Sequence, residues 1–167
     1  MSDEDCVKAL RSTAHPLRLR ILSLLTGAEL SAAEVARELG VTHANASYHL
    51  RVLLDAGEVV VAGEERIRGG VAKRYRHPWR DEDHPGRRRG VDVRTMAHEM
   101  VRRTDLRDPQ VKANFTDAEL WVSEQVWQQA LGLLVQASEL LHAEARPPRS
   151  QGTRPVNLTV AAFAMTS

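Results

Sequence analysis

Residues 31–57 read SAAEVARELGVTHANASYHLRVLLDAG, and this stretch decides the fold that the chain is expected to adopt. Ser31 and Glu34 have the spacing of a capping box, which starts a helix. Gly40 is placed to end this helix, because glycine takes up the left-handed cap conformation without steric cost. Thr42 can cap a second helix directly after the turn. The stretch therefore predicts two consecutive helices joined by a short turn.

The second helix, expected over residues 42–55, separates apolar from hydrogen-bonding side chains. Its inner face is formed, at helical spacing, by Ala46, Leu50, Leu53 and Leu54. Two helices arranged in this way are a helix-turn-helix, whose second helix enters the major groove of DNA. The DNA contacts of this helix are expected from Thr42, His43, Asn45, Ser47, Tyr48, His49 and Arg51. Among these, Asn45 suits a paired hydrogen bond to adenine, and Arg51 suits a phosphate or a guanine.

A β-hairpin is predicted directly after the second helix. Residues 58–62 and 71–77 are β-prone, and Gly69 with Gly70 supplies the positive φ that a hairpin tip needs. A hairpin in this place is the wing of a winged helix. Its basic side chains suit phosphates or a minor groove, and they are Arg66, Arg68, Lys73 and Arg74.

Several motifs in the same order resemble the ArsR-type winged-helix repressors. They are AHPLRLRIL at 14–22, EVARELG at 34–40, SYHLRVL at 47–53 and AG at 56–57. The resemblance covers about residues 7–77. It implies a homodimeric winged helix that binds double-stranded operator DNA. In this family a helix before the winged helix and a helix after the wing contribute to the dimer.

Three parts are expected along the chain. Residues 1–77 form the winged helix-turn-helix DNA-binding domain, which includes a first helix over residues 4–14. Residues 78–115 hold a charged linker, PWRDEDHPGRRRG, and then a dimerisation helix. Residues 116–167 form a C-terminal unit for dimerisation or ligand sensing. The predicted fold class is therefore mainly α with a small amount of β.

The C-terminal unit is predicted to be a strand, a helix and a strand. Residues 117–122 and 156–163 have the composition of strands. Ser123 starts a long helix between them, which is expected to bury one broad face. That face consists of Val126, Trp127, Ala130, Leu131, Leu134, Ala137 and Leu141.

Composition sets limits on the compartment. The single cysteine, Cys6, excludes an intrachain disulfide, and no apolar run approaches the length of a membrane-spanning helix. The net charge of +1 is too small to indicate a partner by itself. A cytoplasmic protein with no membrane attachment is expected.

Three kinds of effector are open at this point. Relatives that sense soft metals use thiolates near the turn, and residues 30–34 contain no cysteine. A second kind of metal site would take its ligands from both copies of a dimer. The candidate ligands are Asp92, His98, Glu99 and His142, and the alternative is that they are scattered surface side chains. Redox sensing by Cys6 is disfavoured, because three acidic neighbours raise the pKa of its thiol. An organic effector would need an apolar pocket in the C-terminal part. The residues that could line such a pocket could equally form a plain hydrophobic core, and they are Phe115, Trp121, Trp127, Phe163 and Met165.

The sequence thus predicts a homodimeric transcriptional repressor that an unidentified effector releases from DNA. It contains no Gly-rich phosphate loop, HExxH or GxSxG motif, so neither catalysis nor a cofactor is expected. The alternative is a winged helix that serves only in dimerisation or protein interaction and does not bind DNA.

Overall fold

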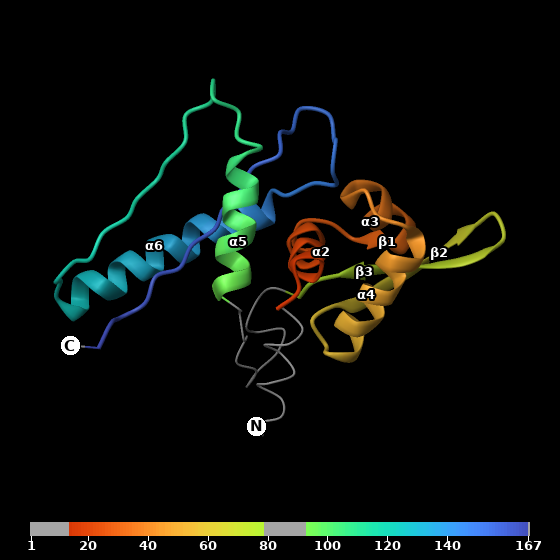
Figure 1. Ribbon diagram of the computed structural model, residues 1–167, viewed down its shortest axis with the longest axis horizontal. Coiled ribbons are helices and arrows are strands. Elements are labelled where there is room, and N and C mark those ends of the chain that lie inside the picture. Colours follow the sequence, from red (N-terminus) through yellow and green to blue (C-terminus); the bar gives the residue numbers. More distant parts are fainter. Residues whose placement is uncertain (1–13, 79–92, 167) are drawn as a thin grey trace.

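The computed structural model describes residues 14–78 and 93–166 (Figure 1). The helix expected over residues 4–14, Cys6, Asp92 and most of the charged linker lie outside the described residues. The elements, in chain order, are α2 (Pro16–Thr26), β1 (Leu30–Ser31), α3 (Ala32–Leu39), α4 (His43–Asp55), β2 (Val60–Ile67), β3 (Gly70–Arg76), α5 (Val93–Thr104) and α6 (Glu124–Ala143).

The predicted caps form at both helices of the helix-turn-helix. The hydroxyl of Ser31 accepts a hydrogen bond from the backbone N–H of Glu34, and the carboxylate of Glu34 accepts one from the N–H of Ser31 at 2.8 Å. Gly40 ends α3 with φ +66°, in the left-handed region. The hydroxyl of Thr42 accepts from the N–H of Asn45 at 3.2 Å and starts α4. These local signals therefore position α4 as predicted.

The wing is the hairpin of β2 and β3, which projects beyond α3 and α4 (Figure 1). The three strands form one antiparallel sheet in the order β1-β3-β2, with Leu30 opposite Tyr75. An irregularity in the register lies between Val61 and Gly63. The predicted wing is confirmed, and β1 attaches it to the start of α3.

One hydrophobic core joins α2, α3, α4 and the sheet. Its fully buried side chains include Ile21 and Leu25 of α2, Val35 of α3, and Leu50 and Leu53 of α4. Burying a side chain of this size contributes about 1.5–3 kcal/mol. The core therefore fixes α4 against α2 and leaves the opposite face of α4 in solvent. The predicted fold class, mainly α with small β and a winged helix-turn-helix, is confirmed.

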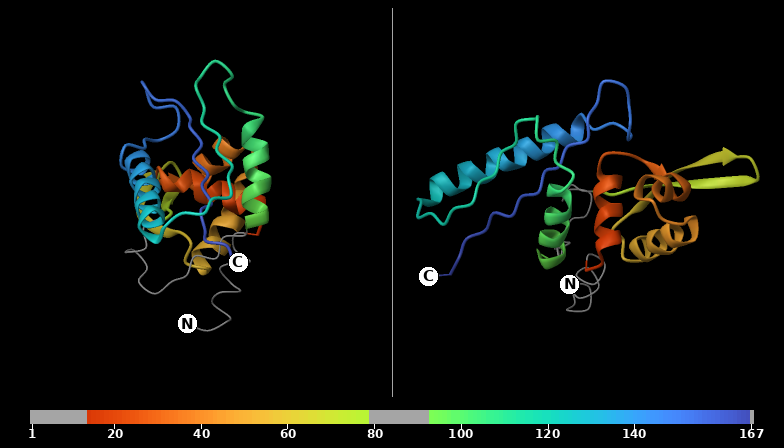
Figure 2. Two further views of the ribbon diagram at one scale, coloured as in Figure 1. Left: turned by 90° about the vertical axis from the view of Figure 1, so that its left-hand side faces the viewer. Right: turned by 45° about the horizontal axis from the view of Figure 1, so that its top comes forward.

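The strands predicted for the C-terminal part are wrong. Residues 117–122 and 156–163 are extended but pair with no strand of the described chain. Figures 1 and 2 show both running along α6. β-branched composition favours an extended backbone, but a strand also needs a neighbour to hydrogen-bond with. Here the two segments lie apart, so the expected strand–helix–strand unit does not form within one chain.

The burial predicted for α6 is also wrong for a single chain. The helix begins and ends close to its expected limits, but none of its residues is buried. Trp127 is half-buried, while Val126, Leu134 and Leu141 are exposed. Because the two neighbouring segments form no sheet, no element of the described chain covers an apolar face of α6.

The helix expected after the linker is present as α5. Its apolar residues Val93, Met100 and Val101 are exposed, whereas Glu99 is almost fully buried. The Glu99 carboxylate accepts from Nε of Arg102 at 2.9 Å and lies 3.9 Å from Nε of Arg103. Paired with two guanidinium groups, this carboxylate is tolerated inside. Among the described residues, no helix is long and apolar enough to cross a membrane.

Candidate nucleic-acid interface

The solvent face of α4 presents the hydrogen-bonding side chains expected to read DNA. Thr42, His43, Asn45 and Arg51 are exposed, and Ser47 is half-buried. Tyr48 is also exposed, with 56% of its surface accessible to solvent. Thr42 also has a structural role as the cap of α4. The helix thus brings six of the seven predicted residues onto accessible surface.

His49 is the exception, because its side chain lies in the core. Only 6% of it is exposed, and its Nδ1 has no hydrogen-bond partner among the described residues. Its ring lies 4.6 Å from that of His15 and 5.1 Å from that of Tyr48, centroid to centroid. The structure therefore does not place His49 for DNA contact. The physical reason is its spacing, since it lies on the same side of α4 as Ala46 and Leu53.

The contact between His15 and His49 links the start of α2 to the middle of α4. Nδ1 of His15 accepts the backbone N–H of Leu17 at 3.1 Å and caps α2, a role that requires an unprotonated Nδ1. Burial and the nearby Arg18 charge lower the pKa of His15. Burial, then His15 and Arg18, lower the pKa of His49. Both shifts favour the neutral form of the rings.

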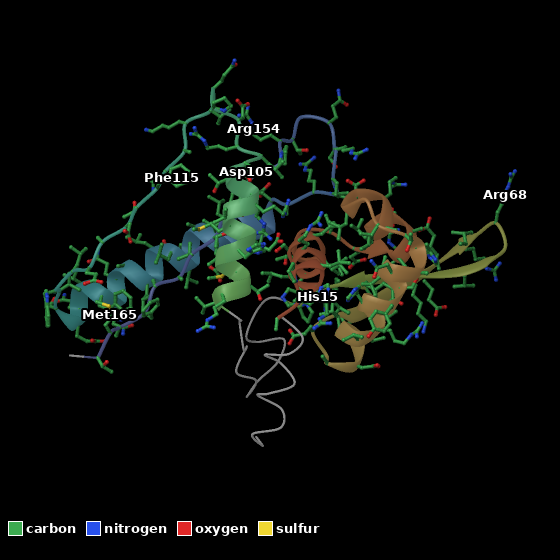
Figure 3. All side chains as sticks on the ribbon, viewed as in Figure 1. His15, Arg68, Asp105, Phe115, Arg154 and Met165 are labelled. Atoms are coloured by element: carbon green, nitrogen blue, oxygen red, sulfur yellow. The ribbon has the colours of Figure 1, made fainter. Side chains whose placement is uncertain are left out.

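The wing carries three basic side chains that are available to a ligand. Arg66, Arg68 and Lys73 are exposed, and none of them forms an ion pair with another described residue. Figure 3 shows Arg68 at the tip of the hairpin, pointing away from the body of the protein. The three side chains therefore extend the surface of α4 with positive charge.

Arg74, the fourth predicted wing residue, is engaged inside the protein. Its Nη1 contacts the carboxylates of Glu65 at 2.8 Å and Glu34 at 3.3 Å, and its Nη2 donates to the carbonyl of Glu29. These contacts tie the wing to the start of α3. The structure therefore gives Arg74 a positioning role in place of an open phosphate-binding position.

Glu34 is a positioning residue that the sequence revealed only in part. Its place in the capping box was predicted, but its ion pair with Arg74 crosses from α3 to β3, and local spacing carries no signal for it. Burial alone would raise the pKa of Glu34. Hydrogen bonds from Ser31 and the charges of Arg74 and Arg37 outweigh that effect and lower the pKa. The carboxylate is thus held charged between the two elements of the interface.

The candidate effector residues that the structure describes do not converge on one site. Within residues 14–78 and 93–166, no group of three or more His, Cys, Asp or Glu side chains is arranged to hold a metal ion. Glu99 is occupied by Arg102 and Arg103, and Nδ1 of His142 contacts the carbonyl of Ser138 at 2.6 Å. The aromatic set expected to form a pocket or a core is largely exposed, with Trp121 at 93%. Figure 3 shows Phe115 on the stretch of chain before α6 and Met165 close to the C-terminal end.

Comparisons with known proteins bear on residues 13–60, which match a family model described as a helix-turn-helix domain. No curated protein matches the chain. The solved structure of NolR from Sinorhizobium fredii is 24% identical, over 47% of this chain and 73% of that chain, with a TM-score of 0.39. A homodimeric winged helix-turn-helix DNA-binding domain from Mycobacterium bovis, described as that of a possible ArsR-family regulator, is 23% identical over 64% and 91%, with a TM-score of 0.40. HlyU from Vibrio cholerae is 23% identical over 64% and 100%, with a TM-score of 0.39.

Proposed function

Because the front part of this chain is a winged helix-turn-helix of the type that its ArsR-like motifs predicted, we propose that the protein is a homodimeric, sequence-specific DNA-binding transcriptional repressor. One observation carries the proposal. The solvent face of α4 bears exposed hydrogen-bonding side chains, and the adjoining wing bears Arg66, Arg68 and Lys73 without ion-pair partners in the described chain. Such a surface matches a major groove flanked by phosphates.

The exposed residues of α4 would supply sequence discrimination. Asn45 can donate and accept with the N7 and N6 edge of adenine, and Arg51 can bind guanine or a phosphate. A good base contact of this kind is worth about 1–3 kcal/mol. His43 and Ser47 lie on the same helix and are placed to contact neighbouring base edges or phosphates. The wing residues would add affinity that does not depend on sequence.

Two copies would bind a palindromic operator, with one α4 in the major groove at each half-site. Half-sites would then lie one or more helical turns apart, about 34 Å for one turn. Repression follows if the bound dimer covers a promoter. An effector would release the DNA by favouring a dimer geometry in which the two α4 helices no longer match both half-sites. The protein would act in the cytoplasm, where its operator lies.

Fluorescence anisotropy with DNA from upstream of the protein's own gene tests the proposal. The titration is run at two salt concentrations, with a scrambled duplex for comparison. We expect preferential binding to the upstream duplex that weakens with salt, because phosphate contacts release counterions. Arg51→Ala should weaken binding about tenfold, within the range expected for one base contact. Arg154→Ala removes an exposed arginine far along the chain and serves as the matched control.

Two results would contradict the proposal. Equal, weak binding to both duplexes would leave a DNA-binding protein without the predicted specificity. No binding at either salt concentration would favour the alternative left open by the sequence, a winged helix used only for protein interaction.

A further inference from the structure

The part of the chain after α5, which we call the C-terminal arm (residues 105–166), exposes most of its large apolar side chains. It consists of an extended segment, α6 and a second extended segment, and it lies on the opposite side of the molecule from the wing (Figures 1 and 2). Its exposed residues include Phe115, Leu120, Trp121, Leu133, Val135, Leu140, Val156, Leu158, Val160 and Phe163. Soluble monomers rarely leave so large an apolar surface uncovered.

We infer that a second copy of this chain covers the C-terminal arm, with the two arms packed against each other. This inference does not rest on the proposed DNA binding. The arm lies outside residues 13–60 that match the helix-turn-helix family, and it bears none of the residues assigned to DNA. It would form a self-association surface in addition to the helices that flank the winged helix.

The exposed area is large enough for a stable dimer. Phe115, Trp121 and Phe163 are 72%, 93% and 69% exposed. At about 150–250 Å² for each aromatic side chain, these three alone offer roughly 350–600 Å². A standard interface buries about 800 Å² on each partner. Exposed aliphatic side chains of α6 and of the last segment add to this area, among them Leu133, Leu140 and Val156 at 60%, 65% and 67%.

The two extended segments of the arm also lack backbone partners among the described residues. Among the described residues, segments 117–122 and 156–163 form no backbone–backbone hydrogen bonds, although both are extended and have strand composition. Unpaired extended segments are templates for pairing with another chain. An isologous contact presents the same surface twice, so a segment of one copy can pair with a segment of the other. The second copy would thus provide the neighbour that each segment lacks.

The arm is held in place on its own winged helix. Arg103 of α5 donates from Nη1 to Oδ1 of Asn157 at 3.1 Å and from Nη2 to Oγ of Ser23 at 2.9 Å. In the loop after α6, Nη2 of Arg149 lies 3.5 Å from the carboxylate of Glu38 in α3. Neighbouring side chains alternate across an extended segment. The side of the last segment that carries Asn157 therefore faces α5, and the side that carries Val156 and Leu158 is presented outward.

The composition of the arm favours a copy of itself over a charged partner. Residues 105–166 contain four arginines, one lysine and seven acidic side chains, a lower share of charged residues than in the whole chain, and neither sign dominates as nucleic acids or charged peptides require. Depletion of charge together with exposed aromatic residues is the composition of the centre of a protein–protein interface. A largely apolar surface is complementary to another copy of itself.

Sedimentation-velocity ultracentrifugation of the full chain, without DNA, tests the inference. The wild type should sediment as a dimer of about 37 kDa, twice the mass of the 18.6 kDa chain. A variant with Leu120→Asp and Phe163→Asp places one charge on each extended segment. We expect its dimer dissociation constant to rise about 100-fold, since two exposed anchors are lost from the interface. Ile67→Asp with Val71→Asp puts the same charges on exposed apolar positions of the wing and should leave the dimer unchanged.

A second measurement keeps the inference testable if the substituted arm misfolds. Hydrogen exchange of the wild type should show protected amides in residues 117–122 and 156–163 that lose protection on dilution. A wild type that sediments as a monomer would overturn the inference. So would an arm variant with wild-type helix content and an unchanged dissociation constant, because other elements would then hold the dimer. Since no DNA is present, failure of operator binding would not alter either readout.

Discussion

Replacing His49 by leucine tests whether this side chain belongs to the core or to the surface proposed to read DNA. An unpaired buried polar group costs about 1–3 kcal/mol, and Nδ1 of His49 is such a group in the described structure. Loss of the ring contacts with His15 and Tyr48 offsets about 0.5–1.5 kcal/mol of that gain. Leucine has a similar size and no polar atom. We therefore expect His49→Leu to raise the free energy of unfolding by about 1 kcal/mol.

The same substitution should reduce the loss of stability in acid. Burial and the neighbouring charges lower the pKa of His49 below 6.5, so the unfolded chain binds this proton more readily than the folded one. The stability contributed by the neutral ring is therefore complete above about pH 6.5 and is lost as the pH falls through the lowered pKa of the folded state. His15 behaves in the same way, since its pKa is also lowered. His49→Leu should remove one of the two contributions.

Urea denaturation followed by circular dichroism, above and below the ordinary histidine pKa of about 6.5, measures both effects. Operator affinity is measured by anisotropy on the same preparations. His43→Leu is the matched control, because His43 is exposed on the same helix. It should leave the denaturation curves unchanged and alter DNA affinity, whereas His49→Leu should do the reverse. A less stable His49→Leu protein, or one that binds the operator tenfold more weakly at neutral pH, would refute the assignment of His49 to the core.

Three further predictions follow from the local geometry. Gly40→Ala forces alanine to φ +66° and should lower the free energy of unfolding by about 1–2 kcal/mol. Gly132→Ala, at an open position in α6, is the control and should not destabilise the protein. Urea denaturation compares the two variants. Ser31→Ala removes one half of the capping box and should cost about 1 kcal/mol in thermal denaturation. Arg68→Ala should reduce the slope of log DNA affinity against log salt concentration by about one and leave stability unchanged. Arg74→Ala should instead lower the free energy of unfolding, because the ion pairs of Arg74 with Glu34 and Glu65 are lost.

The parts of the fold that could be predicted depend on neighbours within about one helical turn. Ser31, Glu34, Gly40 and Thr42 act on backbone groups at most four residues away, so their spacing alone determines where α3 and α4 begin and end. The Gly69-Gly70 tip and its flanking β-prone residues are equally local. These signals were sufficient for the helix-turn-helix and the wing, and therefore for most of the surface assigned to DNA.

The parts that were missed depend on contacts between distant segments. Because histidine is polar, His49 was predicted to lie on the surface. It is buried because it lies on the same side of α4 as Ala46, Leu50 and Leu53. Arg74 is basic and lies on the wing, yet its Glu34 partner is distant in sequence. In the arm, composition predicted two strands and a helix with one buried face, and neither the strands nor the burial is present in the described chain. Composition carried no information on which molecule would cover these segments.

Helix α2 connects the arm to α4, the helix proposed to read DNA. On one side, Oγ of Ser23 accepts from Arg103 of α5, which also lies beside the buried carboxylate of Glu99. On the other side, α2 shares a core with α4, and Nη2 of Arg20 donates to the carbonyl of Leu39, just before the turn. If a change in the packing of two arms displaces α5, one of two things must follow. Either α2 moves together with α4, or the hydrogen bond between Arg103 and Ser23 breaks. In a dimer joined through its arms, the distance between the two α4 helices is then set by the packing of the arms. A molecule that alters this packing would change the fit to both half-sites without touching the DNA-binding surface.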